Sequence, residues 1–485
     1  MTQASALQTS ISATEQFQAE LDASSLTKPM WMLWILSAGL IALDGFDFFI
    51  IGVAMPFIQR DFGLSASWVG AIATAALAGA LVGSLTLGPI TDKVGRQRML
   101  VVDIGLFIVA SAATALAWNA ESLLVFRFLV GVGIGADYPI SVSYITENVP
   151  TRFRGRMVIG AFSFQSVGAL LGALVGWATI AVFHQTAPEM AVAYAWRWML
   201  GVGILLSVVV GGLRLLFLLE SPTYYLAKGQ YESASKAASQ LLEKTIHFEK
   251  NSSEKKGIEN ALDSSEEKGD TTTLEYFDLF SPTYRKQTAL ASVPWFLQDI
   301  ATYGIGIFTP TIIAALAFSQ ESDFLTQEMA SAKGAAIANS FLVVGFLFAI
   351  WLINKVGRIR LQMLGFCGMA TGLWVLSLSG DSLTLLFAGF VLFNLMMNLG
   401  PNSTTFLLSG EVFPPAIRAS GAGLAGGIAK SGAVLGALLL PVLQDNIGVV
   451  GVVRSLSLVC VLAAIVTYAL RSATAFNQNS NEEES

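Results

Sequence analysis

Charged residues are scarce in this sequence. Asp, Glu, Lys and Arg make up 13% of its 485 residues, about half the share found in soluble domains. Apolar side chains make up 54%, and the mean hydropathy is +0.63. This composition excludes an ordinary soluble protein and is typical of a chain that crosses a membrane many times. The formal net charge of −6 is small for this length and gives no reason to expect a nucleic-acid partner.

Cysteine and histidine are also rare. Cys367 and Cys460 both lie in apolar stretches, so they predict neither a disulfide framework nor a metal site. His184 and His247 are isolated from each other and from any nucleophile, so nothing indicates an enzyme, and we expect no cofactor. Residues 1–30 lack the basic start and apolar core of a cleavable signal peptide. We therefore expect the first apolar helix to direct insertion into the membrane.

Apolar stretches long enough to span a bilayer, about 20 residues each, recur along the chain. They predict an all-α membrane protein with twelve transmembrane helices in two six-helix halves. The expected spans are 31–58, 67–90, 99–118, 122–147, 156–183, 198–219, 288–317, 333–353, 361–379, 382–410, 416–442 and 448–470. The expected domains are an N-terminal segment (1–30), a first half (31–219), a linker (220–287), a second half (288–470) and a tail (471–485).

The linker contains a charged, Ser-rich stretch, EKNSSEKKGIENALDSSEEKGDTTT at 249–273. Its composition favours loose ordering, as does that of NQNSNEEES at 477–485. Lys and Arg concentrate in the loops after the second, fourth, eighth and tenth spans. By the positive-inside rule these loops, the linker and both termini face the cytoplasm of a cell (plasma or inner) membrane.

The two halves resemble each other in sequence. DKVGR at 92–96 recurs as NKVGR at 354–358, and Glu147, Pro150 and Arg154 recur at the same spacing as Glu411, Pro414 and Arg418. Because the matched loops lie on the same predicted side, this is a parallel repeat. Such a repeat suits a carrier that works by alternating access, in which two halves rock around a site near the bilayer midplane.

GPITDKVGRQR at 88–98 and RFLVGVGIG at 127–135 resemble signatures of the major facilitator superfamily. The resemblance covers nearly the whole chain and implies the twelve-helix fold of that family. It also implies that the loop charges form a cytoplasmic gate whose members pair in one state and part in another. The gate residues would be Asp92, Arg96, Glu147, Arg154, Glu411 and Arg418. An alternative is that these charges only anchor the loops at the membrane interface.

Five ionisable residues lie well inside predicted spans, where each costs about 2.5–3.5 kcal/mol. A function is the default interpretation of such groups, and a structural ion pair is the alternative. They are Asp44, Asp47, Asp137, Asp299 and Lys430. Asp44 and Asp47, three residues apart, lie on one side of a helix, and two carboxylates so close in an apolar medium cannot both ionise easily. This pair therefore suggests a reversible proton carrier, although one of the two could instead cap a broken helix near Gly45.

Asp137 adjoins Pro139, which predicts a kinked helix that exposes polar backbone to a cavity, or simply a packing kink. In WFLQDIATYG at 295–304, steps of four residues place Trp295, Asp299 and Tyr303 on one helix face.

GADYPIS (135–141), FSFQSVG (162–168), WFLQDIATYG and GPNSTTFLLSGEVFP (400–414) together resemble the phosphate:proton symporter family. The resemblance implies that Asp44, Asp47 and Asp137 transfer protons. It also implies a set of residues that contact phosphate, namely Tyr138, Gln165, Trp295, Asp299, Tyr303 and Lys430. Asp103 matches an acidic position of the family. LESPTYYLAKG (219–229) departs from the related sugar-porter signature, because Thr223 stands where arginine is usual.

The sequence thus predicts a proton-coupled importer of inorganic phosphate whose partners are its small solute, protons and the lipid bilayer. Symport of a sugar or a small organic anion such as an aromatic acid is the alternative. A membrane nutrient sensor fits less well, because the 220–286 linker is too polar and short for a structured sensory domain.

Overall fold

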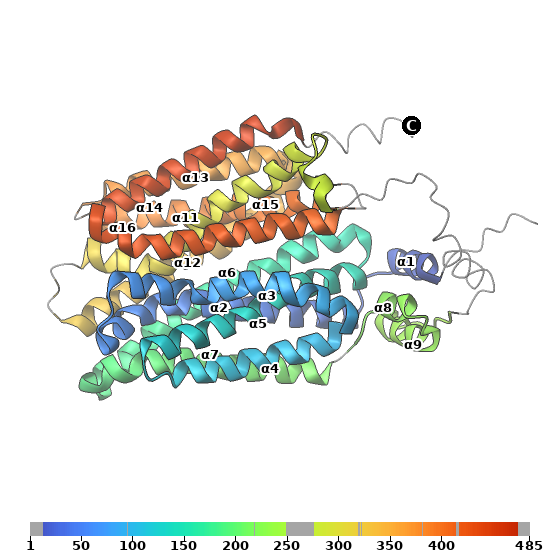
Figure 1. Cartoon of the computed structure of the whole chain (residues 1–485), viewed down its shortest axis with the longest axis horizontal. Helices are drawn as coiled ribbons and strands as arrows, with labels where there is room; N and C mark the ends of the chain where they lie inside the picture. The colour runs from blue at the N-terminus through green and yellow to red at the C-terminus, as the bar shows by residue number, and fades with distance from the viewer. Residues whose placement is uncertain are drawn as a thin grey trace, which may run out of the picture.

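The structure is a computed structural model that describes residues 13–473 apart from 95, 218, 249–275, 319–320, 322, 381 and 414–416. Inside helices, some side chains also lie outside the described set, those of residues 85, 88–94, 96–98, 100, 136–140, 142–143, 227, 276 and 418–419. Every regular element of the described residues is a helix. Figure 1 shows the N-terminal helices, blue to green, packed along the C-terminal helices, yellow to red.

The first half consists of six long helices. They are α2 (Lys28–Phe62), α3 (Ala66–Val94), α4 (Arg96–Ala115), α5 (Ala120–Asn148), α6 (Thr151–Thr186) and α7 (Ala191–Leu216), with a short 3-10 turn, η1 (Pro188–Met190), before the last. Local signals set several ends. The Thr27 hydroxyl accepts a hydrogen bond from the Met30 amide, Asn119 and Ser122 form a reciprocal cap, and Gly63 ends α2 at a φ of 62°.

The second half follows η3 (Tyr276–Phe280). Its helices are α11 (Arg285–Ala317), α12 (Phe324–Val356), α13 (Arg358–Ser377), α14 (Leu383–Leu399), α15 (Pro401–Glu411) and α16 (Arg418–Ala469). The α14–α15 pair breaks at Gly400, where Pro401 lacks the amide that would continue the helix. The 52-residue α16 turns at Gly448, whose φ of 70° favours glycine.

The expected twelve crossings are confirmed. Within the described residues, nine helical stretches are long and apolar enough to span a membrane. The stretch in α16 is long enough for two crossings, and α4 and α5 complete the twelve.

Two helices begin earlier than the predicted spans. α7 begins at Ala191 rather than 198, and α12 begins at Phe324 rather than 333. The apolar pattern near the start of these two helices is interrupted by Arg197, Glu328 and Lys333, which do not end the helices.

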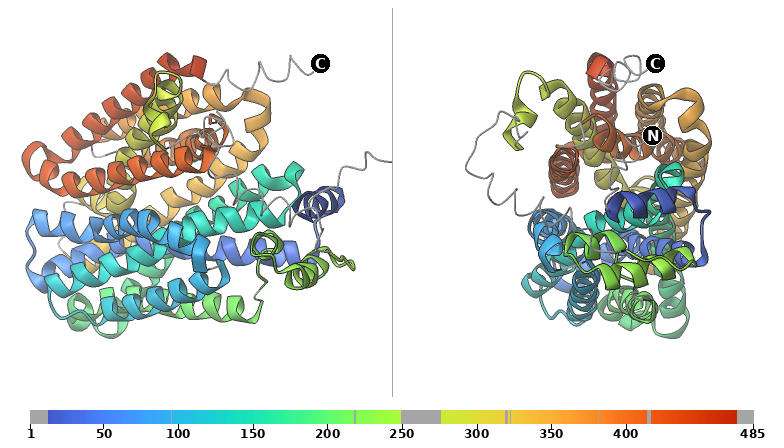
Figure 2. Two further views of the ribbon diagram at one scale, coloured as in Figure 1. Left: turned by 45° about the vertical axis from the view of Figure 1, so that its right-hand side comes forward. Right: turned by 90° about the vertical axis from the view of Figure 1, so that its right-hand side faces the viewer.

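The linker is folded where it leaves the first half. There α8 (Pro222–Ala227) and α9 (Tyr231–Leu242) pack with the N-terminal helix α1 (Ala13–Ala23). Phe17 and Leu21 are fully buried in this cluster. Figure 2 shows the three helices over one end of the N-terminal half. The stretches expected to be loosely ordered, 249–273 and 477–485, lie outside the described residues.

Candidate transport site

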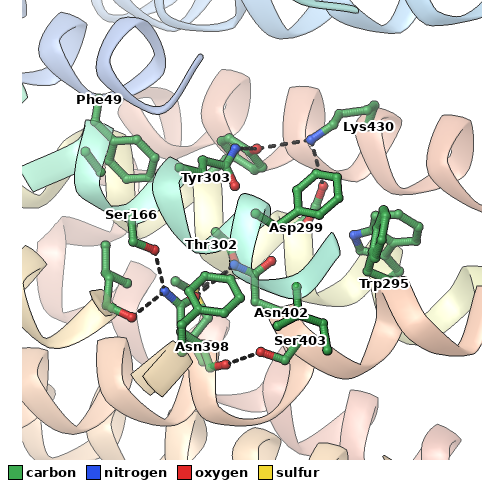
Figure 3. A pocket seen from close by; sticks show the side chains of 18 residues that line it. Phe49, Ser166, Trp295, Asp299, Thr302, Tyr303, Asn398, Asn402, Ser403 and Lys430 are labelled. Carbon is green, nitrogen blue, oxygen red and sulfur yellow. Dashed lines mark hydrogen bonds and ion pairs between the residues drawn. The ribbon is translucent and has the colours of Figure 1, made fainter. Parts of the chain in front are cut away.

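A cavity of about 40 Å³ lies between the two halves, near the middle of α11. Phe49 of α2 and Gln165 and Ser166 of α6 contribute to its wall from the first half, and α11, α12, α14, α15 and α16 contribute from the second (Figure 3). The lining residues are Phe49, Ile159, Phe162, Gln165, Ser166, Ala169, Trp295, Asp299, Thr302, Tyr303, Leu342, Phe346, Met397, Asn398, Asn402, Ser403, Phe406 and Lys430. Five of the six substrate residues expected from the sequence therefore share one cavity, and the side chain of the sixth, Tyr138, lies outside the described set.

The charged centre of the cavity is formed by Lys430 and Asp299. The Lys430 Nζ lies 3.7 Å from the Asp299 Oδ2, with side chains 15% and 3% exposed. The same ammonium donates a hydrogen bond of 3.0 Å to the Tyr303 hydroxyl. One cation, one carboxylate and one phenol thus meet away from bulk water, where each charge interacts more strongly than at a surface.

Gln165 completes this group from the first half. Its Nε2 is 3.5 Å from the Tyr303 hydroxyl, so it links α6 to α11 across the two halves. Gly45 of α2 makes this position possible. A Cβ at Gly45 would lie 2.0 Å from the Gln165 carbonyl oxygen, so only glycine permits α2 and α6 to approach so closely.

Aromatic rings close one side of the cavity. Phe406 packs against Trp295 with ring centres 6.0 Å apart, and against Phe162 at 4.3 Å. Phe49 packs against Tyr303 at 6.5 Å. Because Phe162 and Phe49 belong to the first half and the other three to the second, these rings hold the halves together around the polar centre.

A chain of buried amides runs behind the charged pair. Gln298 donates to Asn402 over 3.0 Å, Asn402 donates to Asn398 over 2.8 Å, and Asn398 donates to Ser166 over 2.8 Å. Figure 3 shows Asn398 and Asn402 beneath Asp299. Neither asparagine was among the expected site residues, although Asn402 lies in the GPNSTTFLLSGEVFP stretch that carries the family resemblance.

The helix-1 carboxylates lie outside this cavity, deep in the first half. Asp44 is 1% exposed. Both carboxylate oxygens of Asp47 accept hydrogen bonds from Arg127 of α5 over 2.7 Å, and the Arg127 side chain is 1% exposed. A buried arginine thus balances the charge of Asp47, and the role of this carboxylate pair as a proton carrier stays a prediction. Arg127 was overlooked, although it opens the RFLVGVGIG motif and carries a charge into an apolar helix.

Glu147 and Arg154, two of the expected gate groups, attract each other electrostatically and also contact residues outside the gate. Glu147 accepts a hydrogen bond from Thr223 over 2.9 Å, the residue that departs from the sugar-porter signature. Arg154 donates to Gln18 of α1 over 3.0 Å and to the Val149 carbonyl over 3.1 Å. These contacts tie the end of α5 to α8 and the start of α6 to α1.

In the second half, Glu411 accepts two hydrogen bonds from Arg358, of 3.0 and 2.9 Å. Arg358 occupies the NKVGR position equivalent to Arg96, so the internal repeat already contained this signal. The side chains of Asp92, Arg96, Asp137, Tyr138 and Arg418 lie outside the described set, and their roles stay predictions. Asp103 is 2% exposed on α4.

The polar groups that line the cavity are of the kinds that bind a small solute by hydrogen bonds and charge. They are an ammonium, a carboxylate, amides and hydroxyls. Within the described part of the chain, no three His, Cys, Asp or Glu side chains gather closely enough to hold a metal ion.

Residues 15–480 match the family described as "Sugar (and other) transporter". An arabinose-proton symporter of Bacillus subtilis is 30% identical over 392 residues, which cover 79% of each chain. Inorganic phosphate transporter 1-1 of Oryza sativa subsp. japonica is 26% identical over 449 residues, 81% of this chain and 80% of that one. The xylose transporter XylE of Escherichia coli, in a partially occluded inward-open conformation, matches with a TM-score of 0.70 over 91% of this chain and 99% of its own. At 18% identity, this last likeness shows the fold alone.

Proposed function

The chain belongs to the sugar (and other) transporter family, within the major facilitator fold, and from this premise we propose that it is a proton-coupled symporter of inorganic phosphate. The observation that carries the proposal is the meeting of Lys430, Asp299 and Tyr303 in one buried cavity. A neutral sugar carries no charge that a buried ammonium must balance. A buried ammonium beside a carboxylate, by contrast, suits a ligand that has both negative charge and a proton.

Lys430 supplies the positive charge that an anion needs. An anion that enters the cavity exchanges its hydration shell for the Lys430 ammonium and for neutral donors on Tyr303, Gln165 and Asn402. These donors come from both halves, so a bound anion joins the halves through its own oxygens. This is the arrangement that alternating access requires.

Asp299 selects among anions. A carboxylate repels most anions, but it can accept a hydrogen bond from the P–OH group of a protonated phosphate. Sulfate near neutral pH has no proton to donate, so the same carboxylate disfavours it. Trp295 and Tyr303 lie one turn to either side of Asp299 on α11 and line the same cavity wall.

The size of the cavity agrees with a small solute. A volume of about 40 Å³ is room for roughly three water molecules. A phosphate ion fits such a space after modest expansion, whereas a pentose or hexose ring requires the aromatic wall at Phe406 and Phe162 to open further.

Proton coupling is assigned to Asp44, Asp47 and Asp137. A proton that reaches Asp47 neutralises the partner of Arg127 and so weakens the 2.7 Å ion pair between α2 and α5. Because Gly45 lies between the two helix-1 carboxylates and packs on Gln165, a shift of α2 reaches the substrate cavity directly. We assign the direction as import, driven by an inward proton gradient. Both termini lie on the cytoplasmic side, as the distribution of loop charges indicates.

Symport of a sugar is the second candidate. The arabinose-proton symporter of Bacillus subtilis supports it through its 30% identity, and the amides of Gln165, Asn398 and Asn402 are suited to sugar hydroxyls. The two candidates differ in what they require of Lys430, which is essential for an anion and dispensable for a neutral ring.

Uptake into proteoliposomes tests the proposal. Labelled phosphate, sulfate, arabinose and benzoate are supplied with and without an inward proton gradient. We expect concentrative uptake of phosphate only when the gradient is present. Lys430→Ala removes a buried charge contact worth about 2–5 kcal/mol and should weaken phosphate binding roughly 30-fold or more. Lys333→Ala, an exposed lysine of α12 outside the cavity, is the matched control and should transport normally.

The Asp299→Asn variant keeps the approximate shape of the side chain and removes its negative charge, so it tests the charge by itself. We expect it to insert normally, to lose phosphate uptake and to admit sulfate as a better competitor, measured across pH 5 to 8. Gradient-driven uptake of arabinose or benzoate that phosphate does not inhibit would overturn the substrate assignment. Normal phosphate affinity in Lys430→Ala would remove Lys430 from the site.

A further inference from the structure

A second and larger cavity lies far from the substrate site, at the end of the second half where the described chain finishes. Its volume is about 740 Å³, and it opens between the start of α13 and the ends of α15 and α16. Volumes of this size are typical of sites that hold a sizeable ligand. It shares no lining residue with the central cavity.

The wall of this cavity carries an excess of positive charge. Arg358, Arg360 and Arg471 line it together with Glu411. Glu411 accepts both of its hydrogen bonds from Arg358, at 2.9 and 3.0 Å, so its charge is matched by that arginine. Arg360 and Arg471 are both exposed and add two further guanidinium groups, whose planar donors suit phosphate oxygens.

A helix terminus adds to this field. The 20-residue α13 begins at Arg358 after Gly357, and no side chain caps its first turn. Gly357, Arg358, Ile359 and Arg360 all line the cavity, so the first amides of α13 face the same space. Partial positive charge at a helix N-terminus favours an anion in addition to the arginines.

The surroundings of the cavity place it at the edge of the bilayer. Lys355, one turn before α13, lies 3.8 Å from the Trp351 ring, a pairing typical of the membrane interface. Tyr468 of α16 at the cavity wall, and Leu364 of α13 and Ile465 of α16 beyond it, are large side chains that are more than half exposed. A ligand in the cavity thus has a basic pocket for its head and an apolar surface for its tail.

We propose that this cavity binds the phosphate group of an anionic phospholipid, with the acyl chains along the exposed faces of α13 and α16. Basic pockets between transmembrane helices recognise such headgroups through the chemistry present here. The lipid phosphate competes with Glu411 for Arg358, so the bound lipid loosens this charge pair between α13 and α15. The site is independent of the substrate that the central cavity carries.

A lipid-binding titration tests the site with the full-length chain in detergent. The probe is a short-chain fluorescent phosphatidylglycerol, and unlabelled phosphatidylglycerol, phosphatidylcholine and inorganic phosphate serve as competitors. Each basic side chain strengthens binding to an anionic lipid about fivefold. Arg360→Gln with Arg471→Gln should therefore weaken probe binding roughly 30-fold.

Two further variants test whether binding of the probe depends on the space inside the cavity and on charges at the cavity itself. Met363→Trp adds bulk to the wall of the cavity, which Met363 lines, without any change in charge, and it should also weaken binding. Lys355→Gln removes a positive charge from the same end of the bundle but outside the cavity and should bind the probe as the native chain does.

Unchanged binding in the double arginine variant or in Met363→Trp would overturn the proposal. So would an equal loss in Lys355→Gln, which would indicate general surface attraction. Displacement of the probe by inorganic phosphate as readily as by phosphatidylglycerol would assign the cavity to free phosphate instead. Phosphate bound near Lys430 does not interfere, because only displacement of the lipid is measured.

Discussion

The buried pair of Asp47 and Arg127 permits a test that separates structural support from proton coupling. Arg127 holds both oxygens of the Asp47 carboxylate at 2.7 Å and also lies 3.3 Å from the Asp47 carbonyl. The Asp47 side chain is 10% exposed and the Arg127 side chain is 1% exposed. The perturbations are Asp47→Asn, Arg127→Met and the two combined. Each keeps the approximate volume of the side chain and removes its charge.

The two single variants are expected to lower the stability of the protein by different amounts. Removal of one partner from a buried pair destabilises by about 3–5 kcal/mol, because the other charge stays buried alone. Arginine remains charged under all accessible conditions, so Asp47→Asn should reach the upper end of this range. Arg127→Met leaves a carboxylate that can take up a proton, so it should fall at or below the lower end. In the double variant no charge is left without a partner, and its stability should return to within about 1 kcal/mol of the native chain.

Two measurements are needed on the same preparations. Thermal unfolding at fixed detergent and lipid gives the stability cycle, and proteoliposome uptake with and without a proton gradient gives the coupling. We expect the double variant to be stable, to exchange substrate and to fail to concentrate it. A double variant as unstable as Asp47→Asn would refute the energetic argument for the pair. Gradient-driven accumulation by the double variant would show that the pair is structural and that Asp47 carries no coupling proton.

The remaining predictions concern the contact between halves and the N-terminal helix. Ser166→Ala removes the 2.8 Å hydrogen bond to Asn398, worth about 1 kcal/mol, and should change turnover about fivefold with little effect on substrate affinity. Ser163→Ala, whose hydroxyl donates to the Gly160 carbonyl of its own helix, is the control, and an equal effect there would contradict the prediction. Burial by itself would raise the pKa of Asp22. Hydrogen bonds from the Thr151 amide and from Gln18 lower the pKa by more than burial raises it, so it lies below its ordinary value of 3.8. The stabilising contribution of Asp22 is therefore fully present above that value and is lost only as the pH falls through the lowered pKa. Hydrogen exchange of α1 should be pH-independent from pH 5 to 8 after correction for intrinsic rates and should rise in Asp22→Asn.

The side chains of the candidate site were partly predictable from the sequence. Steps of four in WFLQDIATYG correctly placed Trp295, Asp299 and Tyr303 on the same cavity wall, because the period of a helix fixes which of its residues share a face. Gln165 and Lys430 were identified by family resemblance, and they do line the cavity. Asn398 and Asn402 were missed, because a polar residue in an apolar helix does not reveal whether it faces a cavity or a neighbouring helix.

What the sequence determined by itself was the number of crossings, the two-fold repeat and the membrane class. Each follows from local properties of the chain, namely the length of apolar stretches, the spacing of motifs and the placement of loop charges. Only the tertiary structure decided which charges meet. Asp47 and Arg127 are 80 residues apart, and Lys430 and Tyr303 are 127 apart, yet both pairs are in direct contact. Such pairings depend on which helix faces pack together, and glycines such as Gly45 permit that packing through approaches too close for any other residue. Because the packing energy is spread over many side chains along each helix, no short motif encodes it.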